Sequence, residues 1–105
     1  MLKKILFVLF LCISTAMFSQ KTLQKLTAAP NPFYTNTSIK FTATKKIPAF
    51  LIVKNVLGKT VYKKKITTKI GTNTIPFTRA NLKSGMYIFA IHSKKEMVSK
   101  RFVIK

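Results

Sequence analysis

The sequence has 105 residues, enough for one domain, and carries 20 Lys and Arg against one acidic residue, giving a net charge of +19 at pH 7. One glutamate without any aspartate excludes a catalytic pair of carboxylates, and one histidine with one cysteine excludes an ordinary zinc site. We therefore expect no enzymatic activity and no cofactor, and a surface that attracts anionic partners.

Residues 1–19 have the layout of a cleavable signal peptide. A positively charged start at Lys3 and Lys4 precedes an unbroken apolar run, residues 5–13, and small or weakly polar residues lead to Ser19. The apolar run is shorter than the roughly 20 residues that span a bilayer. We therefore predict cleavage just after Ser19 and no transmembrane segment in the mature chain.

The sequence has one cysteine, Cys12, which lies inside the apolar run. Lipid attachment at Cys12 is the weaker alternative, because Leu11 precedes it where a small residue is wanted. Cleavage after Ser19 leaves no cysteine, so we expect the mature domain to be held together by apolar burial without disulfides.

Residues 20–29 are interpreted as a short basic tether or a first strand, with the strand near Leu26 to Ala29. Pro30, Asn31 and Pro32 then predict a turn, because proline has no amide hydrogen and restricts the residue before it. The domain proper is expected to span residues 30–105.

Two strands are expected after this turn. Ser38 to Ala43 alternates apolar and polar residues, as a half-buried strand does. Ala49 to Lys54 is almost continuously apolar, which favours a central strand covered on both faces, although a buried helical turn has no distinguishing period over so short a run. Gly58 suits the tight turn that follows at Asn55 to Gly58.

The next two strands are predicted at sheet edges. Lys59 to Thr67 contains three successive lysines, Lys63 to Lys65, which must put at least one lysine on each face and discourage pairing with another molecule. A turn is expected at Gly71 and Asn73. Thr74 to Phe77 follows as a short strand whose Pro76 is best tolerated at an edge.

The stretch from Leu82 to Lys105 predicts a β-hairpin. Apolar residues alternate from Met86 to Ile91, a basic turn occupies Ser93 to Glu96, and a second run ends in Lys100 to Lys105. Because the sequence ends on this strand, we expect a receptor to meet it first. His92 could face Glu96 across the hairpin, but no nucleophile accompanies them and we interpret both as exposed.

About seven short strands, with turn signals about 8 to 12 residues apart, indicate an all-β sandwich. Six aromatic residues fall at apolar strand positions, which favours the core over base stacking, so nucleic acid is not an expected partner. These residues are Phe41, Tyr62, Phe77, Tyr87, Phe89 and Phe102.

The order of these motifs resembles the type A C-terminal sorting domain of the type IX secretion system. The matching residues run through nearly the whole mature chain: Pro30, Asn31, Pro32 and Phe33; Ile39 and Phe41; Asn55 to Lys59 with Gly58; Val61 and Tyr62; Gly71, Asn73 and Ile75; Leu82; Ser84 to Tyr87; and Lys100 to Lys105.

The resemblance implies an immunoglobulin-like β-sandwich that serves as an address label. It implies Sec export to the periplasm, recognition by the outer-membrane translocon, removal by a sortase-like protease and attachment of cargo to anionic lipopolysaccharide, with a secreted or cell-surface fate. The sorting-signal candidates are Gly85, Tyr87, Lys100, Arg101, Phe102, Val103, Ile104 and Lys105, and the family turn motifs are Pro30, Asn31, Pro32 and Gly58.

The last strand suggests how such a label could be read. An exposed edge strand allows recognition by strand addition, with Lys100, Arg101 and Lys105 adding charge selectivity.

Two features depart from the family pattern. Few residues separate the predicted signal peptide from Pro30, which leaves no evident cargo, and the positive charge exceeds what the family needs. One alternative is therefore a small secreted cationic module that binds anionic polysaccharide, lipopolysaccharide or nucleic acid. A third possibility, after the sorting domain and the cationic module, is a remnant gene product without an independent role.

Overall fold

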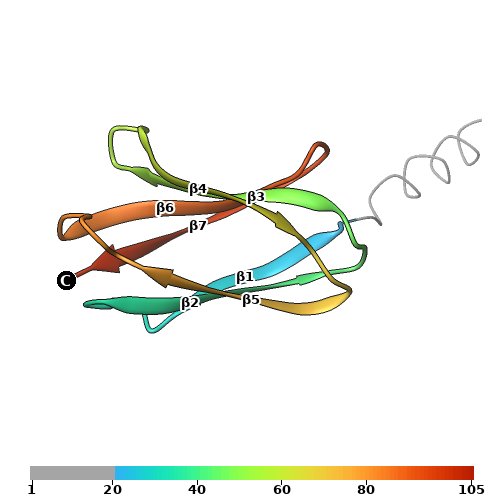
Figure 1. Cartoon of the computed structure of the whole chain (residues 1–105), viewed down its shortest axis with the longest axis horizontal. Coiled ribbons are helices and arrows are strands. Elements are labelled where there is room, and N and C mark those ends of the chain that lie inside the picture. Colours follow the sequence, from blue (N-terminus) through green and yellow to red (C-terminus); the bar gives the residue numbers. More distant parts are fainter. Residues whose placement is uncertain (1–20) are drawn as a thin grey trace, which may run out of the picture.

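The computed structural model describes residues 21–105, which form seven β-strands in two antiparallel sheets (Figure 1). The strands are β1 Leu23–Ala29, β2 Asn36–Ala43, β3 Pro48–Asn55, β4 Thr60–Thr67, β5 Gly71–Thr78, β6 Gly85–His92 and β7 Met97–Ile104. One sheet has the order β1-β2-β5 and the other has the order β4-β3-β6-β7.

The predicted all-β sandwich is confirmed, while its immunoglobulin-like character stays a prediction. The predicted signal peptide and Cys12 lie outside the described residues. Between residues 21 and 105 there is no helical segment with the length and hydrophobicity that crossing a bilayer requires.

The core lies between the two sheets and is built from every second residue of the strands. Ile39 in β2, Leu51 and Val53 in β3, and Ile91 in β6 are fully enclosed. This alternation follows from the strand period of two, which sends successive side chains to opposite faces. Each such side chain contributes about 1.5–3 kcal/mol by leaving water.

Aromatic rings fill one half of this core. The Phe102 ring lies 5.1 Å from the rings of Phe33 and Phe89 and 5.4 Å from that of Phe77, centroid to centroid. Tyr62 meets Phe77 edge to face at 5.2 Å. Each such contact stabilises the fold by about 0.5–1.5 kcal/mol beyond the stabilisation that comes from burying the ring area. Five of the six aromatic residues predicted in the core are buried, and the sixth, Tyr62, is half-buried and packs against that core.

The first strand is longer than expected because of a bulge. Leu23 and Leu26 are both buried although they are three residues apart, a spacing that a regular strand would send to opposite faces. The pairing of β1 with β2 shifts between Gln24 and Thr27, and Lys25 has a φ of 56°. The bulge thus aims both leucines at the core, and residues 23–29 form a strand and no loose tether.

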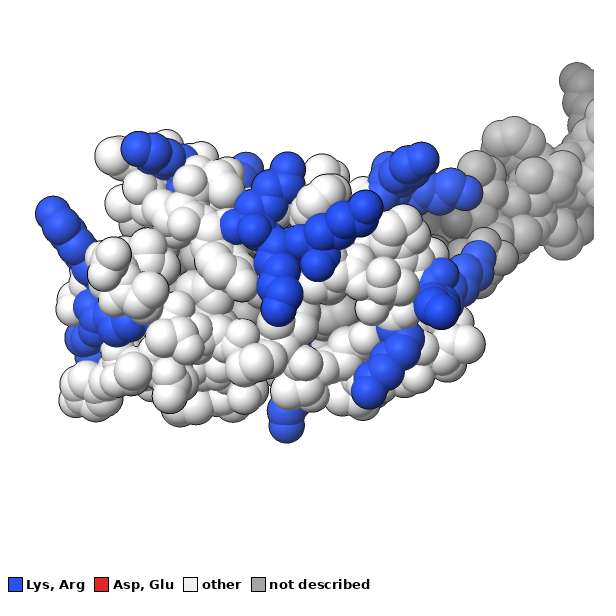
Figure 2. All heavy atoms as spheres, viewed as in Figure 1, with Lys and Arg blue, Asp and Glu red and all other residues white. Residues whose placement is uncertain are grey.

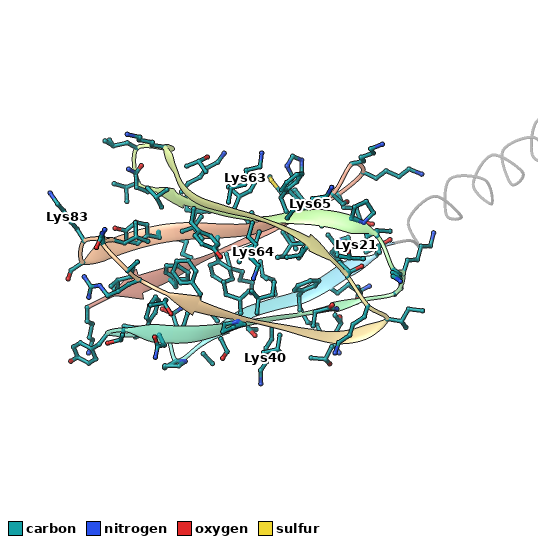
Figure 3. The ribbon with its side chains drawn as sticks, in the orientation of Figure 1. Lys21, Lys40, Lys63, Lys64, Lys65 and Lys83 are labelled. Carbon is teal, nitrogen blue, oxygen red and sulfur yellow. The ribbon has the colours of Figure 1, made fainter. Side chains whose placement is uncertain are left out.

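The predicted edge positions of β4 and β5 are confirmed. Lys64 pairs with buried Leu51 and therefore lies on the inner side of β4, while Lys63 and Lys65 lie on its outer side (Figure 3). At the opposite edge of the same sheet, Lys100 of β7 pairs with buried Phe89 and also lies on the inner side. An inward lysine on each edge strand discourages edge-to-edge pairing.

Two local expectations were wrong. β3 is central, as predicted, but it is covered on one face only, since Phe50 and Ile52 on the outer face are half-buried. Asn73 lies inside β5 instead of in a turn. Its side chain is buried, accepts the amide of Lys69 and donates to the carbonyls of Lys69 and Gly71, so an apparent turn residue closes the preceding loop from within a strand.

Candidate functional site

Several of the predicted family motifs gather at one end of the sandwich, which we call the carboxyl-terminal end, whereas Gly71 lies at the other end, paired with Ala43. Ile104, the last residue of β7, is opposite Gly85 at the start of β6 and forms a bridge with Phe33. The β3–β4 turn that contains Gly58 lies at the same end of the sheet, following Asn55, which pairs with Tyr87 (Figure 1). Motifs that are far apart in the sequence are therefore neighbours in space.

The segment of Asn31 to Phe33 is bonded along the outer edge of β7. The Asn31 side chain accepts the Val103 amide at 3.0 Å and donates to the Arg101 carbonyl at 3.2 Å. The Phe33 amide donates to the Val103 carbonyl at 3.0 Å, and the Lys105 amide donates to the Phe33 carbonyl at 2.8 Å. Four hydrogen bonds thus join the first family motif to the last one.

This arrangement argues against strand addition along the last residues of β7, which stays a prediction. The amide and carbonyl of Val103, the carbonyl of Arg101 and the amide of Lys105 already have partners within the chain. A partner strand could pair there only after Asn31 and Phe33 were displaced. Phe33 is 2% exposed and belongs to the core, so its displacement would also open the sandwich.

Arg79 holds the same end together from the loop after β5. Its Nη1 donates to the carbonyl oxygens of Tyr34 at 3.0 Å and Lys105 at 2.7 Å. Its Nε and Nη2 donate to the carbonyl of Leu82, and Nη2 also reaches Ser84 Oγ at 3.4 Å. One guanidinium therefore connects the loop after Phe33, the loop before β6 and the end of β7.

The sorting-signal candidates divide into core and surface residues. Tyr87, Phe102 and Ile104 are buried, and the Tyr87 hydroxyl donates to the Lys83 carbonyl at 2.7 Å. Gly85 has a φ of 149°, which a side chain would strain even though the space beside it is open.

The remaining candidates lie at or near the surface. Lys100, Arg101 and Lys105 are exposed, and Val103 is half-buried. The Nζ of Lys105 lies 5.6 Å from the centre of the Tyr34 ring. The candidates therefore do not form one continuous surface.

The turn motifs have separate structural roles. The Pro30 carbonyl accepts the Thr37 hydroxyl at 2.7 Å, which ties the turn to β2. Gly58 closes the β3–β4 turn with a φ of 83° and donates its amide to the Asn55 carbonyl. The Asn55 side chain accepts the amides of Leu57 and Lys59, so this turn is fixed locally.

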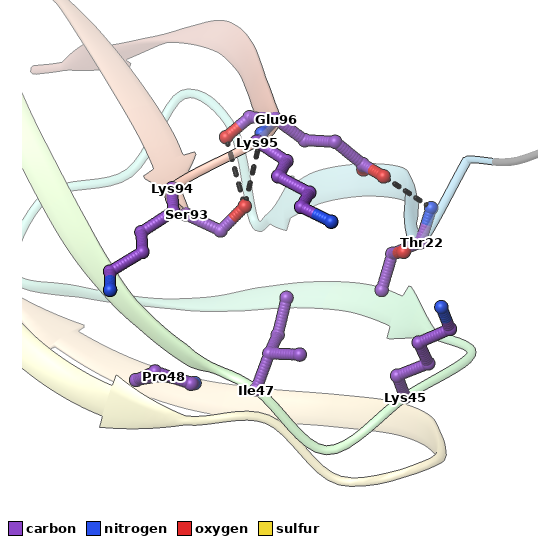
Figure 4. Close-up of a pocket in the computed structure, with 8 residues that line it drawn as sticks. All are labelled: Thr22, Lys45, Ile47, Pro48, Ser93, Lys94, Lys95 and Glu96. Carbon is purple, nitrogen blue, oxygen red and sulfur yellow. Dashed lines mark hydrogen bonds between the residues drawn. The ribbon is translucent and has the colours of Figure 1, made fainter.

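Glu96 lies at the opposite end of the sandwich and fastens the start of the described chain. Its two carboxylate oxygens accept the amides of Thr22 at 2.7 Å and Leu23 at 2.9 Å (Figure 4). Partial burial raises the pKa of Glu96, but these amides, the Thr22 hydroxyl and the charge of Lys21 together hold that pKa below its ordinary value. The carboxylate is thus engaged by backbone, and His92 is not its partner.

The described residues offer little for catalysis or metal binding. Within residues 21–105, no three His, Cys, Asp or Glu side chains gather closely enough to hold a metal ion. A hollow of about 250 Å³ beside Glu96 is bordered by Ile47, Pro48 and three lysines (Figure 4). Ser93 and Glu96 also line it, but the Ser93 hydroxyl is bonded to the Glu96 backbone and the Glu96 carboxylate to the amides of Thr22 and Leu23.

The basic side chains are widely distributed. Lys63 and Lys65 project from one sheet and Lys40 projects from the other, while Lys83 and Lys21 mark opposite ends (Figure 3). The visible face in Figure 2 carries many basic side chains and no acidic ones. The lysines therefore do not define a single track for a linear polyanion.

Sequence reasoning missed two residues of this architecture, Arg79 and the role of Glu96. A signal for Arg79 was available: it is one of two arginines in a chain whose other basic residues are lysines. A planar guanidinium serves several fixed acceptors, which an ammonium does not. No local pattern marked Glu96, because its partners are 73 and 74 residues away in the chain.

Comparison with known proteins gives one family. A family model described as "Secretion system C-terminal sorting domain" matches residues 27–105, which is most of the chain and includes both motifs that meet at β7. No curated protein matches the sequence significantly.

Proposed function

The chain belongs to the family of type IX secretion system C-terminal sorting domains, and from this premise we propose that it is a non-catalytic address label for export to the cell surface or the medium. The observation that carries the proposal is the extent of the family match, residues 27–105, over the folded sandwich. Membership implies contact with the type IX secretion machinery.

The bonding of β7 supports a particular way of reading this label. Because Asn31 and Phe33 bond its outer edge at Val103 and on either side of it, the end of the last strand offers mainly side chains to a partner. We propose that the translocon recognises the folded domain through exposed side chains, including those of Arg101 and Lys105.

The route before and after recognition is part of the proposal. The signal-peptide layout of residues 1–19 supports entry into the periplasm through the Sec pathway. Membership of the family supports removal by a sortase-like protease at the outer membrane, with attachment to anionic lipopolysaccharide.

A reporter fusion tests the proposed function. Residues 20–105 are placed behind an exported reporter in a bacterium that has a type IX system, and the reporter is measured in the periplasm, at the surface and in the medium. Delivery beyond the outer membrane that depends on the translocon is expected. Reporter retained in the periplasm, or delivered equally in a translocon deletion strain, would count against the proposal.

The variants in this experiment must separate folding from recognition. Deleting residues 100–105 removes Phe102 and Ile104 from the core and would unfold the domain whatever its surface does. A double change of Arg101 and Lys105 to glutamine keeps those core side chains and leaves the inward Lys100 in place. The double variant is expected to lower export while the domain stays folded.

A further inference from the structure

The outer face of the four-stranded sheet has unusually apolar residues for a surface. Antiparallel sheets normally carry polar residues on their solvent side. Here that side carries Phe50 and Ile52 from β3 and Met86 and Ile88 from β6, with Met97 from β7; Met86 is 43%, Ile88 39% and Met97 62% exposed. Several apolar side chains on neighbouring strands, left open to solvent, indicate an interaction surface.

The other sheet provides an internal comparison. Its outer positions on β5 are Thr72, Thr74, Pro76 and Thr78, and β2 presents Lys40 there between Ser38 and Thr42. That face is polar, as a solvent-facing sheet should be. The apolar character is therefore specific to the four-stranded sheet and not a general property of this small domain.

An open groove of about 580 Å³ lies over the part of this face formed by β3, β4 and the β6–β7 turn. Phe50 and Ile52 line it, with Lys63 and Lys65 from β4 and Lys94 from the β6–β7 turn. The Nζ of Lys63 lies over the Phe50 ring, 4.5 Å from its centre. The cations thus stand above an apolar floor. Figure 3 shows Lys63 and Lys65 projecting from this sheet, away from the other one.

The charges identify the kind of occupant. The only acidic side chain in the sequence is Glu96, and its carboxylate is bound to the amides of Thr22 and Leu23. The lysines of the groove therefore have no carboxylate of their own chain, and an anionic partner would supply the complementary charge. The apolar floor requires that the same partner also bring an apolar side chain.

The shape of the groove favours a protein over a membrane. A flat bilayer surface would meet the lysine heads first and would not reach the Phe50 ring beneath Lys63. A protruding side chain flanked by carboxylates can enter between the lysines and contact the floor. Met97, opposite His92 beside the groove, has a side chain that adapts readily to a protein surface.

We propose that the outer face of the four-stranded sheet is the docking surface for an acidic protein segment, which inserts an apolar side chain over Phe50 and Ile52 and pairs its carboxylates with Lys63 and Lys65. This inference rests on the proposed function, because the partner is then a component of the secretion machinery. Arg101 and Val103 lie on the same face of the sheet, opposite Ile88 and Met86, so the groove and the surface part of the last motif share one face.

Charge reversal with a matched control tests this surface. The full chain is expressed in a type IX host with Lys63 and Lys65 changed to glutamate, or with Lys40 and Lys83 changed to glutamate; all four are exposed. The first pair is expected to lower export about tenfold because like charges meet at the interface, and the control pair is expected to export normally. Unfolding midpoints of both variants show whether either has lost its fold.

Crosslinking in the same cells identifies what occupies the groove. A photoreactive residue at Ile52 is expected to capture an envelope protein at an acidic segment, whereas one at Thr74, on the polar sheet, is not. Changing that acidic segment of the captured protein to lysine should restore export of the variant with glutamates at 63 and 65.

Several outcomes would overturn the inference. These are capture of lipid or lipopolysaccharide at Ile52, equal loss of export in the two charge-reversed pairs, and normal export with glutamates at 63 and 65. In each case export of the unchanged chain shows that the proposed function still stands. Failure of the unchanged chain to leave the periplasm would overturn the function and the docking surface together.

Discussion

Replacing Arg79 by lysine tests whether the guanidinium holds the carboxyl-terminal end together. Arg79 makes five hydrogen bonds, four to backbone carbonyl oxygens and one to the Ser84 hydroxyl. A lysine ammonium keeps the charge but cannot span acceptors on three segments. We therefore expect R79K to weaken the joint between Tyr34, Leu82 and Lys105 without changing the net charge.

The magnitude follows from the contacts. Arg79 is half-buried, so each lost hydrogen bond is partly replaced by water, and roughly three losses at roughly 0.7 kcal/mol each give about 2 kcal/mol. For a domain of this size that corresponds to a fall of about 10 °C in melting temperature. Urea unfolding followed by circular dichroism measures the change in the free energy of unfolding.

The other arginine supplies the control. Arg101 is exposed, and among residues 21–105 no group accepts a hydrogen bond from its side chain, so R101K is expected to change stability by less than about 0.5 kcal/mol. Hydrogen exchange adds a local readout, since the Lys105 amide should lose protection in R79K and keep it in R101K. Equal stabilities for R79K and R101K would refute the role assigned to Arg79.

Three further changes test other parts of the structure. Because the pKa of Glu96 is depressed, its contribution to the free energy of unfolding is complete above the ordinary value of 4.5 and is lost as pH falls through the pKa of the folded state. The urea midpoint of the unchanged chain should therefore drop in acid. The E96Q midpoint should be lower at neutral pH and should depend less on pH. T68V removes a buried hydroxyl that donates to Lys45 and accepts from Ile47, and should cost about 2 kcal/mol in urea unfolding, against almost nothing for the exposed control T74V. Replacing Lys64 or Lys100 by isoleucine removes an inward lysine from a sheet edge, and light scattering should show concentration-dependent association that the unchanged chain lacks.

The local pattern of the sequence was sufficient to predict the strands and the sheet edges. The alternation from Met86 to Ile91 places β6, and the lysines beside Val61 and Tyr62 mark β4 as an edge. These predictions succeed because strand period and edge protection are decided within a few residues. The run at Phe50 and Ile52 was overinterpreted for the same reason: continuous apolarity is typical of a strand covered on both faces, but here the outer face is only half-buried.

The bonds that hold the family motifs together could not be predicted in this way. Asn31 is 70 residues from Arg101 and 72 residues from Val103, its two hydrogen-bond partners in β7. The local sequence around an asparagine does not indicate which distant backbone groups its side chain will bond. The bulge at Lys25 is similar, since only the positions of the core reveal that Leu23 and Leu26 must share a face. Such features depend on the assembled sandwich, and the sequence provides at most an unusual residue, such as an arginine among lysines.

The way the last strand is built decides how experiments on such a label should be interpreted. In residues 102–104, Phe102 and Ile104 fill the core while Val103 bonds to Asn31 and Phe33, so truncation there removes the fold and the recognition surface at once. A loss of export on truncation would therefore be expected even if the translocon never touched this strand. Only changes confined to the outer face can distinguish the two causes, because their side chains leave the core and the Asn31 bonds intact. If such changes abolish export in a folded domain, the label is read as a surface that exists only after both family motifs have come together.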